Sequence, residues 1–261
     1  MTASIETLSA DNLSGVFFDI DGTFTVQGKM HAAAFSALWA MKQKGLRIVP
    51  VTGRPAGWCD HIARMWPVDG VVGENGAFYF WYDIGEGKLQ KRFLDTDEER
   101  RAKGQRLMSV RDEILSTVQG TAVASDQAYR EADLAIDYRE DVDPLGMDDV
   151  ERICSIFKKH GGVCKVSSIH VNGWFGEYDK LKMTKIFAKE RWGVDLDDVK
   201  DGYLFCGDSP NDEPMFQYFP ISVGVRNVLA FADRMKYLPA YVTRGEEGDG
   251  FAEMVDIITR R

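Results

Sequence analysis

The sequence lacks any uninterrupted apolar run of the roughly 20 residues that a membrane-crossing helix needs. The segment from Met1 to Asn12 is polar and has no basic region followed by an apolar stretch, so we expect no secretory signal and a cytoplasmic protein. Cysteine is scarce and shows no C-x-x-C spacing. The four cysteines are Cys59, Cys154, Cys164 and Cys206. Their apolar contexts favour reduced core thiols over a disulfide or zinc site.

Basic residues are also in deficit, 32 against 41 acidic ones, which gives the 261-residue chain a formal net charge of −9. A negative surface repels nucleic acids and anionic membranes, so we expect neither as a partner. Hydrophobic residues make up 44% of the sequence, enough for a real core. The length fits one large domain or a domain with an insert, and it leaves the oligomeric state open.

The hydrophobic pattern alternates strands with helices at both ends of the chain. Buried strands are predicted at residues 16–18, 46–51, 70–72, 203–206 and 221–225. This alternation predicts an α/β protein with a Rossmann-like parallel sheet. Between residues 83 and 175 the pattern changes to hairpins and two helices, the first opened by a capping box at Thr96 and Glu99. We therefore predict a core domain of residues 1–82 and 176–261, with residues 83–175 inserted as an α+β domain.

Two carboxylates directly follow the first strand, in Asp19-Ile20-Asp21-Gly22-Thr23. Ligands of open parallel sheets bind outside the carboxyl ends of the strands. Residues spaced i, i+2 leave a strand on the same side, so one carboxylate can act as a nucleophile while the other transfers a proton. Gly22 permits a tight turn that brings backbone N–H groups towards an anion. The alternative is an Asp-Gly turn with two solvated acids.

Two further strand ends carry polar residues. Thr52-Gly53-Arg54 places a hydroxyl before a helix N-terminus, which predicts an anion site or, taken alone, a simple threonine cap. Gly207-Asp208-Ser209-Pro210-Asn211-Asp212 adds two carboxylates, and such clustered oxygens suit a hard cation such as Mg²⁺. Lys180 opens the preceding helix and could supply a fixed positive charge, or could simply be solvated.

These motifs, in this order, resemble the haloacid dehalogenase superfamily of phosphohydrolases over essentially the whole chain. The insert follows Gly73-Glu74-Asn75-Gly76-Ala77 and precedes the lysine, and Gly248-x-Gly250-Phe251 lies near the C-terminus. Both features are similar to the Cof-like branch, subfamily IIB, whose insert is an α/β cap. Other members of that branch include sugar-phosphate phosphatases and phosphomannomutases.

The resemblance implies a mechanism. Asp19 would attack phosphorus and form an aspartyl-phosphate, and Asp21 would protonate the leaving oxygen and then activate water. Thr52 and the lysine would hold the phosphoryl oxygens. Mg²⁺ would bind Asp19, the backbone carbonyl of Asp21 and Asp208, with Asp212 in support. The further phosphate-binding residues would be Gly22, Gly53, Arg54, Asn75 and Asn211.

One motif departs from the family. Its third motif is usually Lys-Gly before a helix, whereas this chain reads Asp179-Lys180-Leu181-Lys182-Met183. The lysine is therefore Lys180 or Lys182. We favour Lys180, because it begins the helix and leaves Met183 where the family has a small apolar residue.

Three residues of the insert are candidates for substrate selection. His170 and Asn172 alternate with apolar residues and share one face of a predicted strand, and Arg130 precedes another strand. The alternative is an open sheet face in solvent. The sequence thus predicts a Mg²⁺-dependent phosphatase for a small phosphorylated metabolite, with a sugar phosphate favoured. A phosphomutase of the phosphomannomutase type and a non-catalytic sugar-phosphate-binding module are the alternatives.

Overall fold

The computed structural model describes residues 2–9, 12–167 and 169–260. Its largest sheet has six strands, all parallel. In spatial order they are β1 (Ala3–Ser4), β13 (Tyr241–Val242), β12 (Ile221–Gly224), β11 (Tyr203–Gly207), β2 (Gly15–Phe18) and β3 (Arg47–Pro50). The predicted α/β class with a parallel sheet is confirmed.

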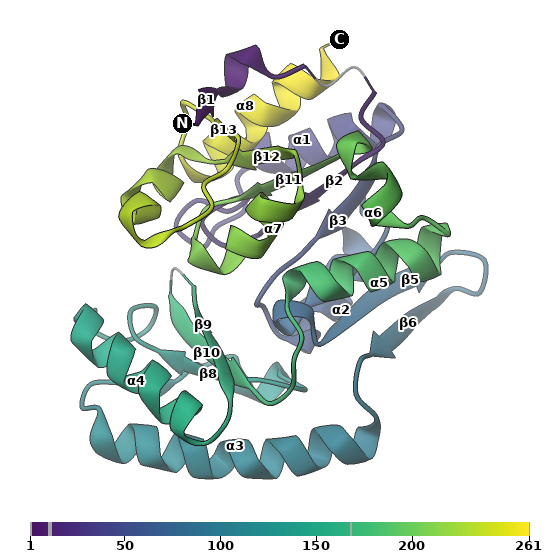
Figure 1. Cartoon of the computed structure of the whole chain (residues 1–261). Coiled ribbons are helices and arrows are strands. Elements are labelled where there is room, and N and C mark those ends of the chain that lie inside the picture. Colours follow the sequence, from purple (N-terminus) through teal and green to yellow (C-terminus); the bar gives the residue numbers. More distant parts are fainter. Residues whose placement is uncertain (1, 10–11, 168, 261) are drawn as a thin grey trace.

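Helices cover both faces of this sheet (Figure 1). Alternate residues of β2 show why: Val16 and Phe18 pack in one hydrophobic cluster, and Phe17 packs in another on the opposite face. The first face carries α1 (Ala32–Gln43), α2 (Ala56–Met65) and α8 (Glu247–Thr259). The second carries α5 (Lys180–Trp192), α6 (Leu196–Val199) and α7 (Glu213–Tyr218). The sheet is therefore buried on both sides, as its near-continuous apolar strands require.

A small antiparallel sheet extends this larger lobe. It consists of β4 (Val71–Gly73), β5 (Phe78–Asp83) and β6 (Lys88–Phe93). An isolated parallel bridge between Val51 and Val72 joins β4 to the end of β3. Leu89 and Phe93 of β6 pack against the first hydrophobic cluster, so the hairpin is part of the larger lobe's packing.

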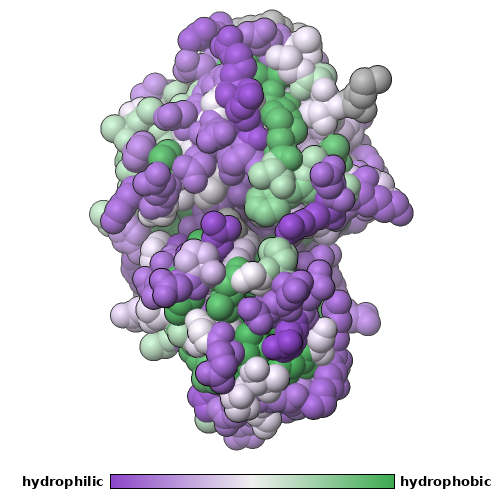
Figure 2. Space-filling view, turned by 90° about the vertical axis from the view of Figure 1, so that its left-hand side faces the viewer, coloured by the Kyte–Doolittle hydropathy of each residue, from purple (hydrophilic) through white to green (hydrophobic). Residues whose placement is uncertain are grey.

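The smaller lobe has its own antiparallel sheet and hydrophobic cluster (Figure 1). Its strands, in spatial order, are β7 (Ala122–Val123), β8 (Leu134–Asp137), β10 (His170–Trp174) and β9 (Val163–Val166). Two helices, α3 (Asp97–Thr117) and α4 (Met147–Lys159), cover it. The capping box predicted at the start of α3 is present. Figure 2 shows a mostly hydrophilic face on which the two lobes meet at a waist.

Short elements account for most differences from the predicted pattern. The strand β1 and the helix α6 have two and four residues, too few to show a periodicity. A 3₁₀ helix spans Arg226–Arg234. The other 3₁₀ turns are Ile5–Thr7, Glu74–Gly76, Gln127–Tyr129, Lys200–Gly202 and Pro210–Asp212. No helix within the described residues is long and apolar enough to span a membrane.

Candidate active site

The predicted acidic residues meet at the carboxyl end of the parallel sheet. Asp19 follows β2 and Asp208 follows β11, and the backbone N–H of Asp19 donates to Cys206 O at 2.9 Å. Gly22 turns the chain here with φ of +74°, and a Cβ at this residue would lie 2.5 Å from Asp208 Oδ2. Only glycine therefore permits this close approach of the two loops.

Three buried carboxylates form a cluster. One carboxylate oxygen from each of Asp19, Asp208 and Asp212 lies within 4.8 Å of the others. Lys180 Nζ lies 2.8 Å from Asp19 Oδ1 and 2.7 Å from Asp212 Oδ1, and the lysine side chain is 2% exposed. Lys182 Nζ instead donates to Glu177 O on an exposed surface. The structure thus brings Lys180, and not Lys182, to the acidic cluster.

Burial and crowding of like charges dominate the electrostatics. Burial raises the pKa of Asp19 to about 7, although Lys180 acts in the opposite direction. Burial also raises the pKa of Asp208 well above its ordinary value. One ammonium group cannot balance three buried carboxylates, and the remaining negative charge on oxygen ligands is what a hard divalent cation such as Mg²⁺ neutralises. The residues present therefore fit a Mg²⁺ ion.

Neighbouring groups fix the orientation of these carboxylates. Asp212 Oδ2 accepts hydrogen bonds from the backbone N–H groups of Asp208 and Ser209, at 3.1 and 3.3 Å. The Thr23 hydroxyl donates to Asp208 Oδ1 at 3.3 Å. Asn227 Nδ2 donates to Asp208 Oδ2 at 3.3 Å and to Gly22 O at 2.9 Å. Sequence reasoning missed Asn227, because it lies on a 3₁₀ helix outside every motif.

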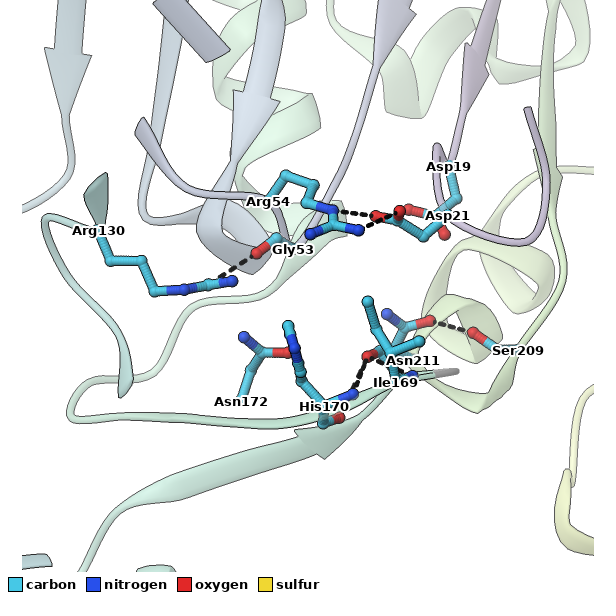
Figure 3. Close-up of a pocket in the computed structure, with 11 residues that line it drawn as sticks. Asp19, Asp21, Gly53, Arg54, Arg130, Ile169, His170, Asn172, Ser209 and Asn211 are labelled. Atoms are coloured by element: carbon cyan, nitrogen blue, oxygen red, sulfur yellow. Dashed lines mark hydrogen bonds and ion pairs between the residues drawn. The ribbon is translucent and has the colours of Figure 1, made fainter. Parts of the chain in front are cut away.

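Arg54 holds Asp21 in a two-point ion pair (Figure 3). Its Nε and Nη2 lie 2.9 and 2.8 Å from the two Asp21 oxygens. The same guanidinium reaches two carboxylates of the smaller lobe, Asp126 at 3.3 Å and Glu140 at 3.0 Å. It also lies over the Trp58 ring, 4.4 Å from its centroid. The predicted phosphate ligand thus connects Asp21 to the smaller lobe.

Arg130 is enclosed between the lobes. Its Nη1 donates to Gly53 O and to Asp133 Oδ1, both at 2.9 Å, and its Nε donates to Asp126 at 3.0 Å. The side chain is 1% exposed. With its donors already engaged by buried acceptors, Arg130 is suited to holding the lobes together. The contact of Arg130 with substrate stays a prediction. The engagement of its donors by protein acceptors does not favour it.

His170 and Asn172 face the larger lobe from β10 (Figure 3). His170 Nε2 lies 2.8 Å from Glu140 Oε2, and Asn172 Nδ2 donates to Asp133 Oδ2 at 3.3 Å. Both side chains are buried, so the alternative of an open sheet face in solvent is wrong.

The remaining predicted residues surround the end of β3. The Thr52 hydroxyl accepts the Arg54 N–H at 3.0 Å, but α2 begins after Pro55 without a side-chain cap, so the simple threonine cap considered from the sequence is wrong. Asn75 lies against Gly53, and its buried Nδ2 has no hydrogen-bond partner among the described residues. Asn211 Oδ1 accepts from the Ser209 hydroxyl at 2.7 Å. An unpaired amide beside a glycine turn is suited to receiving a ligand oxygen.

A small cavity of about 20 Å³ joins these groups. The larger lobe contributes Asp19, Asp21, Gly53, Arg54, Ser209 and Asn211 to its wall, and the smaller lobe contributes Arg130, Ser167, Ile169, His170 and Asn172. Thr52, Lys180 and Asp208 lie around this cavity rather than in its wall. The two lobes therefore enclose one polar site over the acidic cluster.

The comparisons with known proteins agree with this geometry. Residues 16–104 match the family model of the haloacid dehalogenase-like hydrolases. None of the curated proteins matches the chain in sequence. The match confirms the predicted resemblance to the haloacid dehalogenase-like hydrolases over residues 16–104. The fold, an α/β core with a second lobe over its acidic site, agrees with that match.

Solved structures with low sequence identity share the fold. A Thermoplasma acidophilum protein is 19% identical, with a TM-score of 0.70 over 94% of this chain and 99% of that one. The C-terminal domain of the C. albicans trehalose-6-phosphate phosphatase is 17% identical, with a TM-score of 0.71 over 95% and 93%. The sucrose-phosphatase of Synechocystis sp., solved with sucrose and phosphate, is 15% identical, with a TM-score of 0.64 over 94% and 98%.

Proposed function

We propose that this protein is a Mg²⁺-dependent phosphatase that hydrolyses a small phosphorylated metabolite, such as a sugar phosphate, through an aspartyl-phosphate on Asp19. The observation that carries the proposal is the buried contact of Lys180 with both Asp19 and Asp212 at the carboxyl end of the sheet. Phosphoryl transfer needs positioned charge more than covalent chemistry, and this cluster supplies it. The phosphatases among the structural neighbours support the same reaction class.

Each residue has a role that its contacts support. Lys180 engages one oxygen of Asp19, which leaves the other as the nucleophile towards phosphorus. Asp21 protonates the leaving oxygen and later takes a proton from the attacking water. Thr52, Lys180 and the amides of Asn75 and Asn211 hold phosphoryl oxygens.

Asp19, Asp208 and the Asp21 carbonyl would hold the metal, with Asp212 in support. Mg²⁺ would neutralise charge on the phosphoryl oxygens during transfer. The deficit of positive charge in the cluster supports its presence.

The inserted segment, residues 83–175, is proposed to act as a cap. Support comes from the separate hydrophobic cluster that its residues form from Leu107 onward, and from their contribution to the wall of the small cavity. Such a cap would select the leaving group and exclude water during transfer.

The two alternatives receive less support. A phosphomutase must rebind a bisphosphate in reverse, so its cap needs a strong second phosphate site. Arg130, one candidate for that site, already binds Asp126 and Asp133, so such a site would depend on another cap arginine such as Arg139. A binding module needs neither a positioned nucleophile nor a second carboxylate beside it.

The test is hydrolysis of p-nitrophenyl phosphate and a panel of sugar phosphates, with Mg²⁺ and with EDTA. Asp19→Asn should abolish Mg²⁺-dependent turnover while the far-ultraviolet circular dichroism stays unchanged. Retention of wild-type activity by a purified Asp19→Asn protein would refute the proposal.

A further inference from the structure

A second cavity, of about 580 Å³, lies beside the small one. Asp21, Arg54 and Ile169 line both, so the two spaces adjoin at the proposed acid–base residue. The small cavity is too small for more than a phosphoryl group, whereas the large one is within the size range of small-molecule sites. A leaving group whose oxygen is protonated by Asp21 would therefore extend into the large cavity.

Most charged groups that line the large cavity already have partners. Asp21 and Glu140 both pair with Arg54, and Glu140 also contacts His170. Asp208 accepts from Thr23 and Asn227. Glu247 Oε2 accepts the backbone N–H of Gln27 at 3.3 Å. These contacts occupy the cavity's acidic groups and its buried arginine.

Arg139 is different. It follows β8 on the smaller lobe, is exposed and lines this cavity, and it has no ion pair within the described residues. Burial raises the pKa of the neighbouring Tyr138, and Arg139 opposes that shift, which places the guanidinium beside the Tyr138 hydroxyl. That hydroxyl donates to Ser167 O at 2.8 Å. Arg139 is thus a cation in the cavity wall without an ion-pair partner among the described residues.

We infer that Arg139 binds a second anionic group on the substrate. The preferred substrate is then a phosphate monoester whose leaving alcohol also carries a carboxylate or a second phosphate. A guanidinium suits either anion, because its fork of N–H donors matches two oxygens at once. This inference rests on the proposed function, which places the phosphoryl group at Asp19.

The test compares substrates that differ in one charge. Glycerol 3-phosphate and 3-phosphoglycerate differ only in a hydroxymethyl or a carboxylate group. Fructose 6-phosphate and fructose 1,6-bisphosphate form the phosphate pair. We expect the wild type to show a lower KM for the more anionic member of at least one pair, and that pair identifies the anion.

Arg139→Gln should raise the KM for that anionic substrate about ten- to a hundredfold, as expected for loss of a hydrogen bond to a charged group. Its KM for the less anionic member of the pair and its hydrolysis of p-nitrophenyl phosphate should change by less than about threefold. Arg152→Gln is the matched control, because Arg152 lies exposed on α4 of the same lobe. Equal losses on both members of a pair, or no loss on either, would overturn the inference.

Equilibrium binding separates this inference from the proposed function. Calorimetry with Asp19→Asn and Mg²⁺ measures the affinity for both members of each pair without turnover. If the wild type hydrolyses no ester, but Asp19→Asn prefers the anionic member and loses that preference on Arg139→Gln, the inference stands and the proposed function fails. If turnover is normal and neither protein discriminates, the inference alone fails.

Discussion

The substitution Glu74→Gln should destabilise this protein far more than an isosteric change usually does. Glu74 is fully buried, and its carboxylate accepts backbone N–H groups from both lobes. Oε1 accepts Ala56 N at 3.0 Å and Glu131 N at 2.9 Å. Oε2 accepts Ala132 N at 2.6 Å and Asp133 N at 3.1 Å. Burial raises the pKa of Glu74, and these N–H groups act in the opposite direction.

A glutamine cannot satisfy this arrangement in either orientation. An NH₂ group in place of Oε2 would take the acceptor from Ala132 N and Asp133 N. In place of Oε1 it would take the acceptor from Ala56 N and would face Glu131 N, which would keep only its 3.1 Å bond to Oε2. Each such loss costs about 1–3 kcal/mol, and removing a buried charge offsets part of the total. We expect a net loss of about 2–4 kcal/mol, which corresponds to a fall in Tm of about 5–15 °C for a chain of this size.

Glu213→Gln is the matched control. Only Oε1 of Glu213 accepts backbone N–H groups, from Lys236 at 2.6 Å and Tyr237 at 2.8 Å, so a glutamine keeps both bonds with its carbonyl oxygen. Its Tm should stay within about 3 °C of the wild type, which corresponds to about 1 kcal/mol. Urea unfolding followed by tryptophan fluorescence measures both variants. A Glu74→Gln protein as stable as Glu213→Gln would refute the donor-conflict argument.

Three further outcomes follow from the site. Lys180→Ala should lower kcat/KM for p-nitrophenyl phosphate about 10²–10³-fold, whereas Lys182→Ala should change it little; equal effects would place the catalytic charge elsewhere. Asp21→Asn should lose less activity on p-nitrophenyl phosphate than on a sugar phosphate, because the first leaving group needs little protonation; equal losses would contradict that role. The hydrogen bond with His170, and to a smaller extent the charge of Arg54, hold the pKa of the Glu140 carboxyl at about 2, against an ordinary value of 4.5. The ionised Glu140 carboxylate should therefore stabilise the protein fully above pH 4.5 and progressively less towards pH 2. The difference in Tm between the wild type and Glu140→Gln should then shrink in acid. A difference that grows in acid would refute this.

The sequence predicted the parallel sheet and its strand-end acids because both depend on local patterns. Alternate burial along β2 requires apolar residues on both faces, and a strand that ends in Asp19 places that residue at the ligand-binding edge. The fold class is confirmed, and the family resemblance is confirmed over residues 16–104. The domain boundaries and the residue roles stay predictions.

Contacts between the lobes could not be predicted in the same way. Arg54 and Glu140 are 86 positions apart, and Glu74 meets the N–H groups of residues 131–133 only when the lobes pack together. No periodicity encodes such pairs. Arg130 illustrates the difficulty, because an arginine before a strand gives no sign of whether its partner will be a substrate or a buried Asp133. The half-buried Cys154 and Cys164 also depart from the predicted core thiols.

The chemistry of the interface explains how the two lobes enclose a charged site. Near the point where the chain returns from the smaller lobe to the larger one, Trp174 packs in the larger lobe's hydrophobic cluster. It stacks on Tyr178, with ring centroids 5.3 Å apart. Around the site the contacts are ionic instead, through Arg54 and Arg130. The side chains of Arg130 and Arg54 are 1% and 6% exposed, so these pairs are shielded from water and removing one partner would be costly. The apolar and the ionic contacts thus hold the two lobes together on different sides of their interface.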